Sequence, residues 1–168
     1  KIDGLISIVD DVGVAAFVNN GGVHVDGWET QLDWRPRPGT RLVLAHAYAR
    51  QHGRILVDTT PPEYADTDHS TPSHTTSLLA IQTLPYGLEA SAAYYLIDNM
   101  RWLGFTTANE NTGDYQILDA RLAYRLRAGG VRGTVALVGQ NMLGPYSDFW
   151  NRAEMERRTF LNLSLEFR

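Results

Sequence analysis

The sequence predicts an all-β fold of antiparallel up-and-down strands, and three observations predict it. Apolar and polar residues alternate with a period of two along several segments, which is typical of strands that have one apolar face. Tight and long connections alternate between these segments. The 168 residues contain no run of about 18 apolar residues, so we expect no transmembrane helix, and any crossing of a membrane would use strands.

The first three predicted strands are residues 28–35, 40–50 and 73–84. In the first, Trp28 and Leu32 fall on one face, and Glu29 and Asp33 on the other. The second has an apolar face that His46 interrupts, opposite a face of small residues. The third is apolar enough for a strand, but its pattern does not fix which residues share a face.

Four more strands are predicted at residues 88–97, 115–127, 134–140 and 159–167. The clearest alternation separates Leu118 and Leu122 from Asp119 and Arg121, whereas a helix would spread these charges around its circumference. The last segment alternates in the same way and ends on Phe167. Residues 151–157 are the helical candidate, because they are charged and lack this alternation.

The connections separate into two kinds. Residues 36–39, 85–87 and 128–130 are tight and rich in proline or glycine, as hairpin turns require. Residues 51–72, 98–113 and 142–157 are long and polar. In an up-and-down meander this alternation places every tight turn at one end and every long loop at the other. Outer-membrane barrels have this asymmetry, and their tilted strands of about 9 to 11 residues match the predicted lengths.

The strand count predicts about seven or eight transmembrane β-barrel strands. Bacterial barrels use an even number, and an open sheet edge in hydrocarbon would leave backbone groups without partners. Residues 1–3 therefore predict the end of an eighth strand, followed by a loop at residues 4–21. We expect the chain to be an excerpt from a larger barrel.

Composition excludes several functions. The net charge is −4, so the chain lacks the basic surface that nucleic acid requires. The absence of cysteine excludes disulfides and cysteine-based metal sites. We find no nucleophile elbow, phosphate-binding loop or dinucleotide fingerprint, and expect neither an enzyme nor a cofactor.

Several segments, taken in order, resemble the barrel of TonB-dependent outer-membrane receptors. They are residues 17–22 (FVNNGG), 27–29 (GWE), 32–36 (LDWRP), 42–48, 71–78 and 140–146 (QNMLGPY). The resemblance implies that residues 1–168 form one C-terminal barrel segment, without the plug domain and TonB box that lie N-terminal in that family. It implies that Phe167 is the barrel-assembly signal, although Arg168 follows it where family members end on the aromatic residue.

What the resemblance implies about function is transport without catalysis. Such receptors lie in the outer membrane of Gram-negative bacteria and import an iron–siderophore complex, cobalamin or a similarly scarce ligand. The implied partners are outer-membrane lipid, a small-molecule or metal-chelate ligand, and the TonB complex, which would be reached through the missing N-terminal part.

Charged and polar residues of the predicted strands should face the barrel interior, where they either contact plug and solute or simply solvate the lumen. They are Glu29, Gln31, Asp33, Asp119, Arg121, Arg125, Asn162 and Glu166. The candidate ligand-binding residues lie in the long loops. They are Asp66, Asp68, His69, Trp102, Phe105 and Trp150. The alternative for Asp66, Asp68 and His69 is a solvated polar loop, and the alternative for the three aromatic residues is an aromatic girdle at the membrane surface. The spacing predicts no metal site.

Two alternatives remain open. One is a small, complete eight-stranded outer-membrane barrel that acts as an enzyme or adhesin. The other is a soluble lipocalin-like protein that binds an apolar ligand. The apolar face distinguishes them, because it points outward in a membrane barrel and inward in a soluble one.

Overall fold

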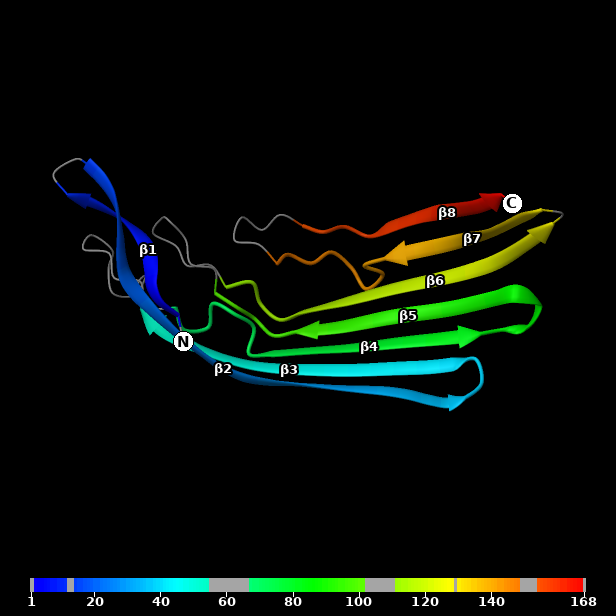
Figure 1. The fold of residues 1–168 in the computed structure, drawn as a ribbon, viewed down its shortest axis with the longest axis horizontal. Coiled ribbons are helices and arrows are strands. Elements are labelled where there is room, and N and C mark those ends of the chain that lie inside the picture. Colours follow the sequence, from blue (N-terminus) through cyan, green and yellow to red (C-terminus); the bar gives the residue numbers. More distant parts are fainter. Residues whose placement is uncertain are drawn as a thin grey trace.

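The computed structural model describes residues 2–11, 14–54, 67–101, 111–128, 130–148 and 154–167. In this part of the chain, eight antiparallel strands form one open sheet whose spatial order follows the sequence (Figure 1). The strands are β1 (Ile2–Asp11), β2 (Val14–Arg37), β3 (Thr40–Arg54), β4 (His74–Thr83), β5 (Leu88–Ile97), β6 (Tyr115–Ala128), β7 (Val131–Gln140) and β8 (Arg158–Phe167). A single 3-10 turn, η1 (Pro85–Gly87), joins β4 to β5.

The three tight turns lie together at one end of the sheet, on the right in Figure 1. Gly39 between β2 and β3 has φ 81°, and Gly87 after η1 has φ 82°, a left-handed region that glycine enters without steric cost. Tyr86 also has a positive φ of 61°. The strand ends from which the connections β3 to β4, β5 to β6 and β7 to β8 start lie at the opposite end. The predicted alternation of tight and long connections is confirmed from β2 to β8.

The strand register unites the apolar faces of separate strands into one. Residues that are direct partners in an antiparallel pair point to the same side of the sheet. Leu32 pairs with Leu44 and Leu44 with Leu78, while further along Leu122 pairs with Leu137 and Leu137 with Leu161. We call this side the apolar face. The opposite side carries Glu29, Asp33, Arg41, Glu89, Arg121 and Arg125, and we call it the charged face.

The apolar face is open, and the charged face is the more covered of the two. Trp34, Leu122 and Leu163 keep 55%, 48% and 62% of their surface exposed. On the charged face, the side chains of Glu89 and Arg121 keep 21% and 36%. A soluble protein would bury the first set and expose the second. The apolar face therefore matches a surface meant for lipid rather than for water.

A conventional hydrophobic core is missing from the described residues. The buried apolar side chains there are Val23, Ala123 and Ala136. The accessible surface is 11768 Å², whereas a compact protein of 18.8 kDa exposes about 8,300 Å². The sheet therefore needs surroundings that cover its apolar side. None of the described helices is long and apolar enough to cross a membrane.

The N-terminal segment differs from the expectation. Residues 4–21 were expected to form a loop, but residues 4–11 belong to β1 and residues 14–21 to the first half of β2, and the two strands pair antiparallel. The runs LISIV and AAFV are rich in residues that favour strands, and that preference outweighs the neighbouring glycines. The chain thus has an eighth strand of 10 residues, β1, and β2 is 24 residues long.

The helical expectation for residues 151–157 is wrong where it can be tested. Residues 151–153 lie outside the described part, and Met155 forms an antiparallel bridge with Tyr146. The closed eight-stranded alternative also lacks support, because β1 and β8 are the two edges of the sheet and do not pair with each other. β1 covers only the part of β2 up to Val23, so residues 24–37 have β3 as their one partner strand.

Candidate functional site

A hollow of about 400 Å³ lies on the charged face, at the end of the sheet that bears the long connections. It gathers residues from five strands, β4 to β8, and from the connection between β7 and β8. Its lining consists of Thr75, Tyr95, Ile97, Ile117, Asp119, Gln140, Asn141, Tyr146, Met155, Glu156 and Arg158. Carboxylates, an arginine, amides and phenol rings therefore meet around one open space. Such a mixture suits a polar ligand that also has flat or apolar parts.

Asn141 links β6 to the connection between β7 and β8 by hydrogen bonds in the wall of this hollow. It follows β7 directly with φ 52°, a left-handed conformation that asparagine tolerates better than most residues. Its backbone N–H donates to Asp119 Oδ1 at 2.8 Å, and its side-chain amide donates to the carbonyl of Met155. Only 4% of Asn141 is exposed, and its Oδ1 accepts no hydrogen bond from the described residues. The wall of the hollow thus contains one buried acceptor, Asn141 Oδ1, without a partner among the described residues.

Two tyrosines brace the connection that forms one side of the hollow. The rings of Tyr115 and Tyr146 stack with centroids 5.1 Å apart and planes within 7° of parallel. The N–H of Met155 donates to the carbonyl of Tyr146 at 2.8 Å. Burial raises the pKa of the Tyr146 phenol, and the carboxylates of Asp148 and Asp119 raise it further. Tyr146 therefore presents a neutral hydroxyl at physiological pH, not a phenolate.

Ion pairs stabilise the charged face nearer the tight turns. Arg41 donates to Asp33 Oδ2 at 2.9 Å from its Nη2, and its Nε also faces the same carboxylate. Glu89 lies opposite Ala123, so its carboxylate reaches the arginines two residues to either side of that alanine. These side chains cover Ala123, which is one of the few buried apolar residues.

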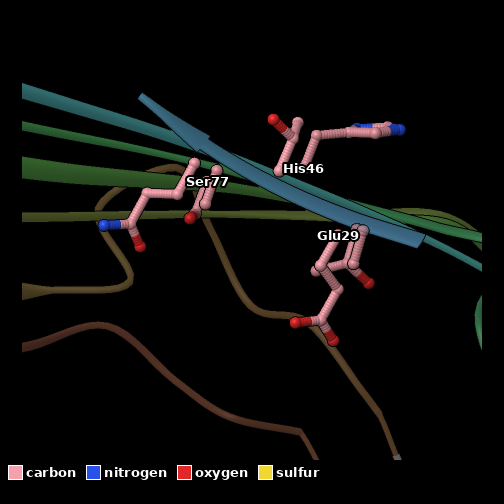
Figure 2. Close-up of a pocket in the computed structure, with 8 residues that line it drawn as sticks. Glu29, His46 and Ser77 are labelled. Atoms are coloured by element: carbon pink, nitrogen blue, oxygen red, sulfur yellow. The ribbon is translucent and has the colours of Figure 1, made fainter. Parts of the chain in front are cut away.

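A second, shallower hollow of about 280 Å³ lies between the large hollow and the ion pairs near the tight turns. Small residues of β3 and β4, among them Ala45, Ala47 and Ser77, form its floor, and Glu29 stands at its edge. Figure 2 shows Glu29 on one side of the sheet and His46 on the other. His46 contributes to the lining from the apolar side of the strand and belongs to a separate cluster.

The eight residues predicted to face the interior all lie on the charged face, as their register partners show. They do not form one site. Asp119 lines the large hollow, and Glu29 and Gln31 line the small one. Arg125 and Glu166 border a third depression of about 220 Å³ near the tight turns.

The loop candidates are only partly described. Asp66, Trp102, Phe105 and Trp150 lie outside the described residues. The carbonyls of Asp68 and His69 accept hydrogen bonds from Arg101, at 3.2 Å from its Nη2 and 2.7 Å from its backbone N–H. These contacts join the residues that precede β4 to the residues that follow β5. The described residues hold no group of three or more potential metal ligands. Phe167 is the last residue of β8.

Sequence reasoning missed most of the large hollow. Tyr95, Asn141, Tyr146 and Arg158 were not predicted as site residues, although Asn141 and Tyr146 belong to a segment that carried the resemblance. The alternation in β5 did place Tyr95 on the side away from the apolar residues. The sequence alone does not reveal the register of β6 against β7, and this register brings Asp119 beside Asn141.

Comparisons with known proteins agree with this architecture. The family model described as "TonB dependent receptor-like, beta-barrel" matches residues 1–142. No curated protein sequence matches the chain. The crystal structure of the ferric-catecholate import receptor Fiu from E. coli K12, in its closed form, is similar with a TM-score of 0.68 at 19% identity. This similarity covers 97% of the chain and 23% of that receptor, and at such identity it shows the fold alone.

The family match covers most of the chain, and the open eight-stranded sheet with its exposed apolar face agrees with a part of a larger barrel. The chain belongs to the TonB-dependent receptor-like β-barrel family, a family of outer-membrane transporters and not of enzymes.

Proposed function

We propose that the chain forms the C-terminal part of the barrel of an outer-membrane receptor that imports a scarce ligand by TonB-dependent uptake. An iron–siderophore complex or cobalamin is the class of ligand we propose. The remaining strands of the barrel, the plug and the contact with the TonB complex would be supplied by parts of the protein outside this chain.

The observation that carries this proposal is the division of the sheet into two faces. A continuous apolar face is what lipid requires, and an open strand edge in hydrocarbon needs a further strand as partner. The charged face would then line the interior, with Glu29, Asp33 and Arg121 among the residues that meet plug and solute. The large hollow would lie near the outer mouth, because the long connections of such barrels are extracellular.

Two observations support the proposed ligand class, the chemistry of the hollow and the structural neighbour. Fiu is named as a receptor for ferric catecholate, and this chain has its fold in the matching region. The hollow offers phenol rings for stacking and polar groups for hydrogen bonds. A neutral Tyr146 is a poor ligand for a bare ferric ion, which favours a metal that arrives inside a chelate.

Uptake by cells that produce the full-length receptor tests the proposal. The probes are radiolabelled iron as a ferric catecholate complex and radiolabelled cyanocobalamin, each with and without a functional TonB protein. We expect accumulation of one probe that stops when TonB is removed. Equal accumulation of both probes without TonB would show a passive pore and contradict the proposal.

A further inference from the structure

A group of polar side chains interrupts the apolar face of β2, β3 and β4. His46 lies on this face because it pairs with Thr30 and Thr76, next to the row that contains Leu44. His74 lies on the same face opposite Tyr48. Ionisable residues on a surface otherwise meant for lipid are costly, which makes these histidines candidates for a functional site. Neither the transport proposal nor the charged face uses these histidines.

The two imidazole rings face each other through single nitrogen atoms. His46 Nε2 lies 3.4 Å from His74 Nδ1, and His46 Nδ1 lies 2.8 Å from Thr76 Oγ1. The tautomer in which Nδ1 donates to Thr76 leaves the lone pair of Nε2 directed toward His74. This arrangement, a ring oriented through its other nitrogen, is how proteins prepare histidine to bind a metal.

The separation of the two nitrogens is long for a direct hydrogen bond and is also the separation that a shared metal requires. Hydrogen bonds from nitrogen are most common near 2.9 to 3.0 Å, so at 3.4 Å this contact is a long hydrogen bond. Two nitrogens bound to one tetrahedral zinc ion at about 2.0 to 2.1 Å stand about 3.3 Å apart. The rings of Trp28 and Tyr48 flank the pair, with centroids 5.2 Å from His46 and 5.1 Å from His74.

We propose that His46 and His74 bind a divalent transition-metal ion of the zinc class on the apolar face, near the end of the sheet that bears the long connections. Because the described residues hold no group of three potential protein ligands, water oxygens would fill the remaining positions. Imidazole nitrogen selects zinc, cobalt or copper over calcium and magnesium. The ion would link β3 to β4. This inference depends on strand register and not on the imported ligand.

The chain supplies a matched control in a second histidine pair. His24 and His52 are direct partners on β2 and β3 and lie on the same face. Their ring centroids are 6.0 Å apart, and His24 Nε2 is 3.0 Å from the Asp26 carboxylate. A nitrogen that is already paired with a carboxylate is not free to share an ion with His52. The two pairs therefore differ in geometry while they match in residue type and face.

Cobalt titration of the full-length receptor in detergent micelles tests the proposal, since tetrahedral Co²⁺ absorbs visible light and zinc displaces it. We expect one equivalent of Co²⁺ to bind and Zn²⁺ to abolish the band. His46→Ala and His74→Ala should each weaken binding at least about tenfold, and Thr76→Val by about 10- to 100-fold. His24→Ala and His52→Ala should bind as the unchanged receptor does.

Three results would overturn the proposal: no cobalt band in the unchanged receptor, a band that survives His74→Ala, or a loss in His52→Ala as large as in His74→Ala. His74 is exposed, so its replacement leaves the strand packing intact, and it carries the test if His46→Ala fails to fold. Folding of each variant is checked by the shift in gel mobility between heated and unheated samples.

Discussion

Glu89 Oε2 on β5 lies 2.7 Å from Arg125 Nη2 on β6, and the same carboxylate also reaches Arg121 at 3.1 Å. One carboxylate thus pairs with two arginines and reduces the repulsion between their charges across Ala123. This bridge fixes the position of β5 against β6 on the charged face.

Removing the bridge should destabilise the barrel modestly. Glu89→Ala leaves both arginines without their carboxylate, and because Arg125 is largely exposed we expect a loss of about 1 kcal/mol. Urea unfolding of the full-length receptor in lipid vesicles measures it. Glu166→Ala is the control, since Glu166 lies on the same face, is exposed and forms no ion pair with the described residues. Equal losses in the two variants would contradict the role of the bridge.

A charge on the apolar face should be far more costly than one on the charged face. Leu122 lies on the apolar face between its partners on β5 and β7. Leu122→Arg should therefore lower the free energy of unfolding by about 2 to 4 kcal/mol and reduce the amount of folded receptor in the outer membrane. Thr134→Arg on β7 is the matched control on the other face. Membrane fractionation and the gel-mobility shift measure both variants. If Thr134→Arg were the more harmful, the assignment of the two faces would be reversed.

The conformation of Asn141 predicts an unequal response to two small replacements. Asn141→Ala loses the hydrogen bond to Met155 and forces alanine into a left-handed conformation, at a combined cost of about 2 to 3 kcal/mol. Asn141→Gly loses only the hydrogen bond and should cost about 1 kcal/mol. Thermal unfolding, together with the rate of proteolysis between β7 and β8, measures the difference. Equal stability of the two variants would argue against backbone strain.

Alkaline pH should loosen the same connection. The pKa of Tyr146 is raised in the folded protein, so folding favours the neutral phenol and its contribution is complete below the ordinary pKa of 10.0. The contribution is lost as the pH rises through the higher, folded pKa. Proteolysis of the connection should accelerate above about pH 10 in the unchanged receptor and less in Tyr146→Phe. An identical pH profile in that variant would remove Tyr146 as the cause.

Local pattern predicted the strands well where one face is apolar throughout. Residues 88–97 match β5 at both ends, and residues 115–127 match β6 to within one residue. The β1–β2 hairpin was missed because glycines and aspartates break the alternation there, and pairing between the two strands decides the conformation. The pattern of β4 likewise did not show which of its residues share a face, and only its register with β3 and β5 does.

The sites depend on contacts that no local pattern contains. In the sequence, His46 is only a polar residue that interrupts an apolar face. Its proposed role as a metal ligand comes from its contacts with Thr76 and His74 on the next strand. The large hollow needs β4 to β8 in register, with the connection after β7 folded back so that Asn141 meets Asp119. Such relationships are set by registers between strands, and one residue of slippage would transfer each side chain to the opposite face.

The strict sequence order of the sheet has a consequence for how the receptor is built. Every strand bonds to the strands that precede and follow it in the chain, so each hairpin can settle on an edge that the previous one has just completed. Contacts between near neighbours in sequence carry little loop-closure entropy, and growth can therefore proceed in steps from either margin. An insertion machinery would need only to guide one hairpin at a time into the bilayer.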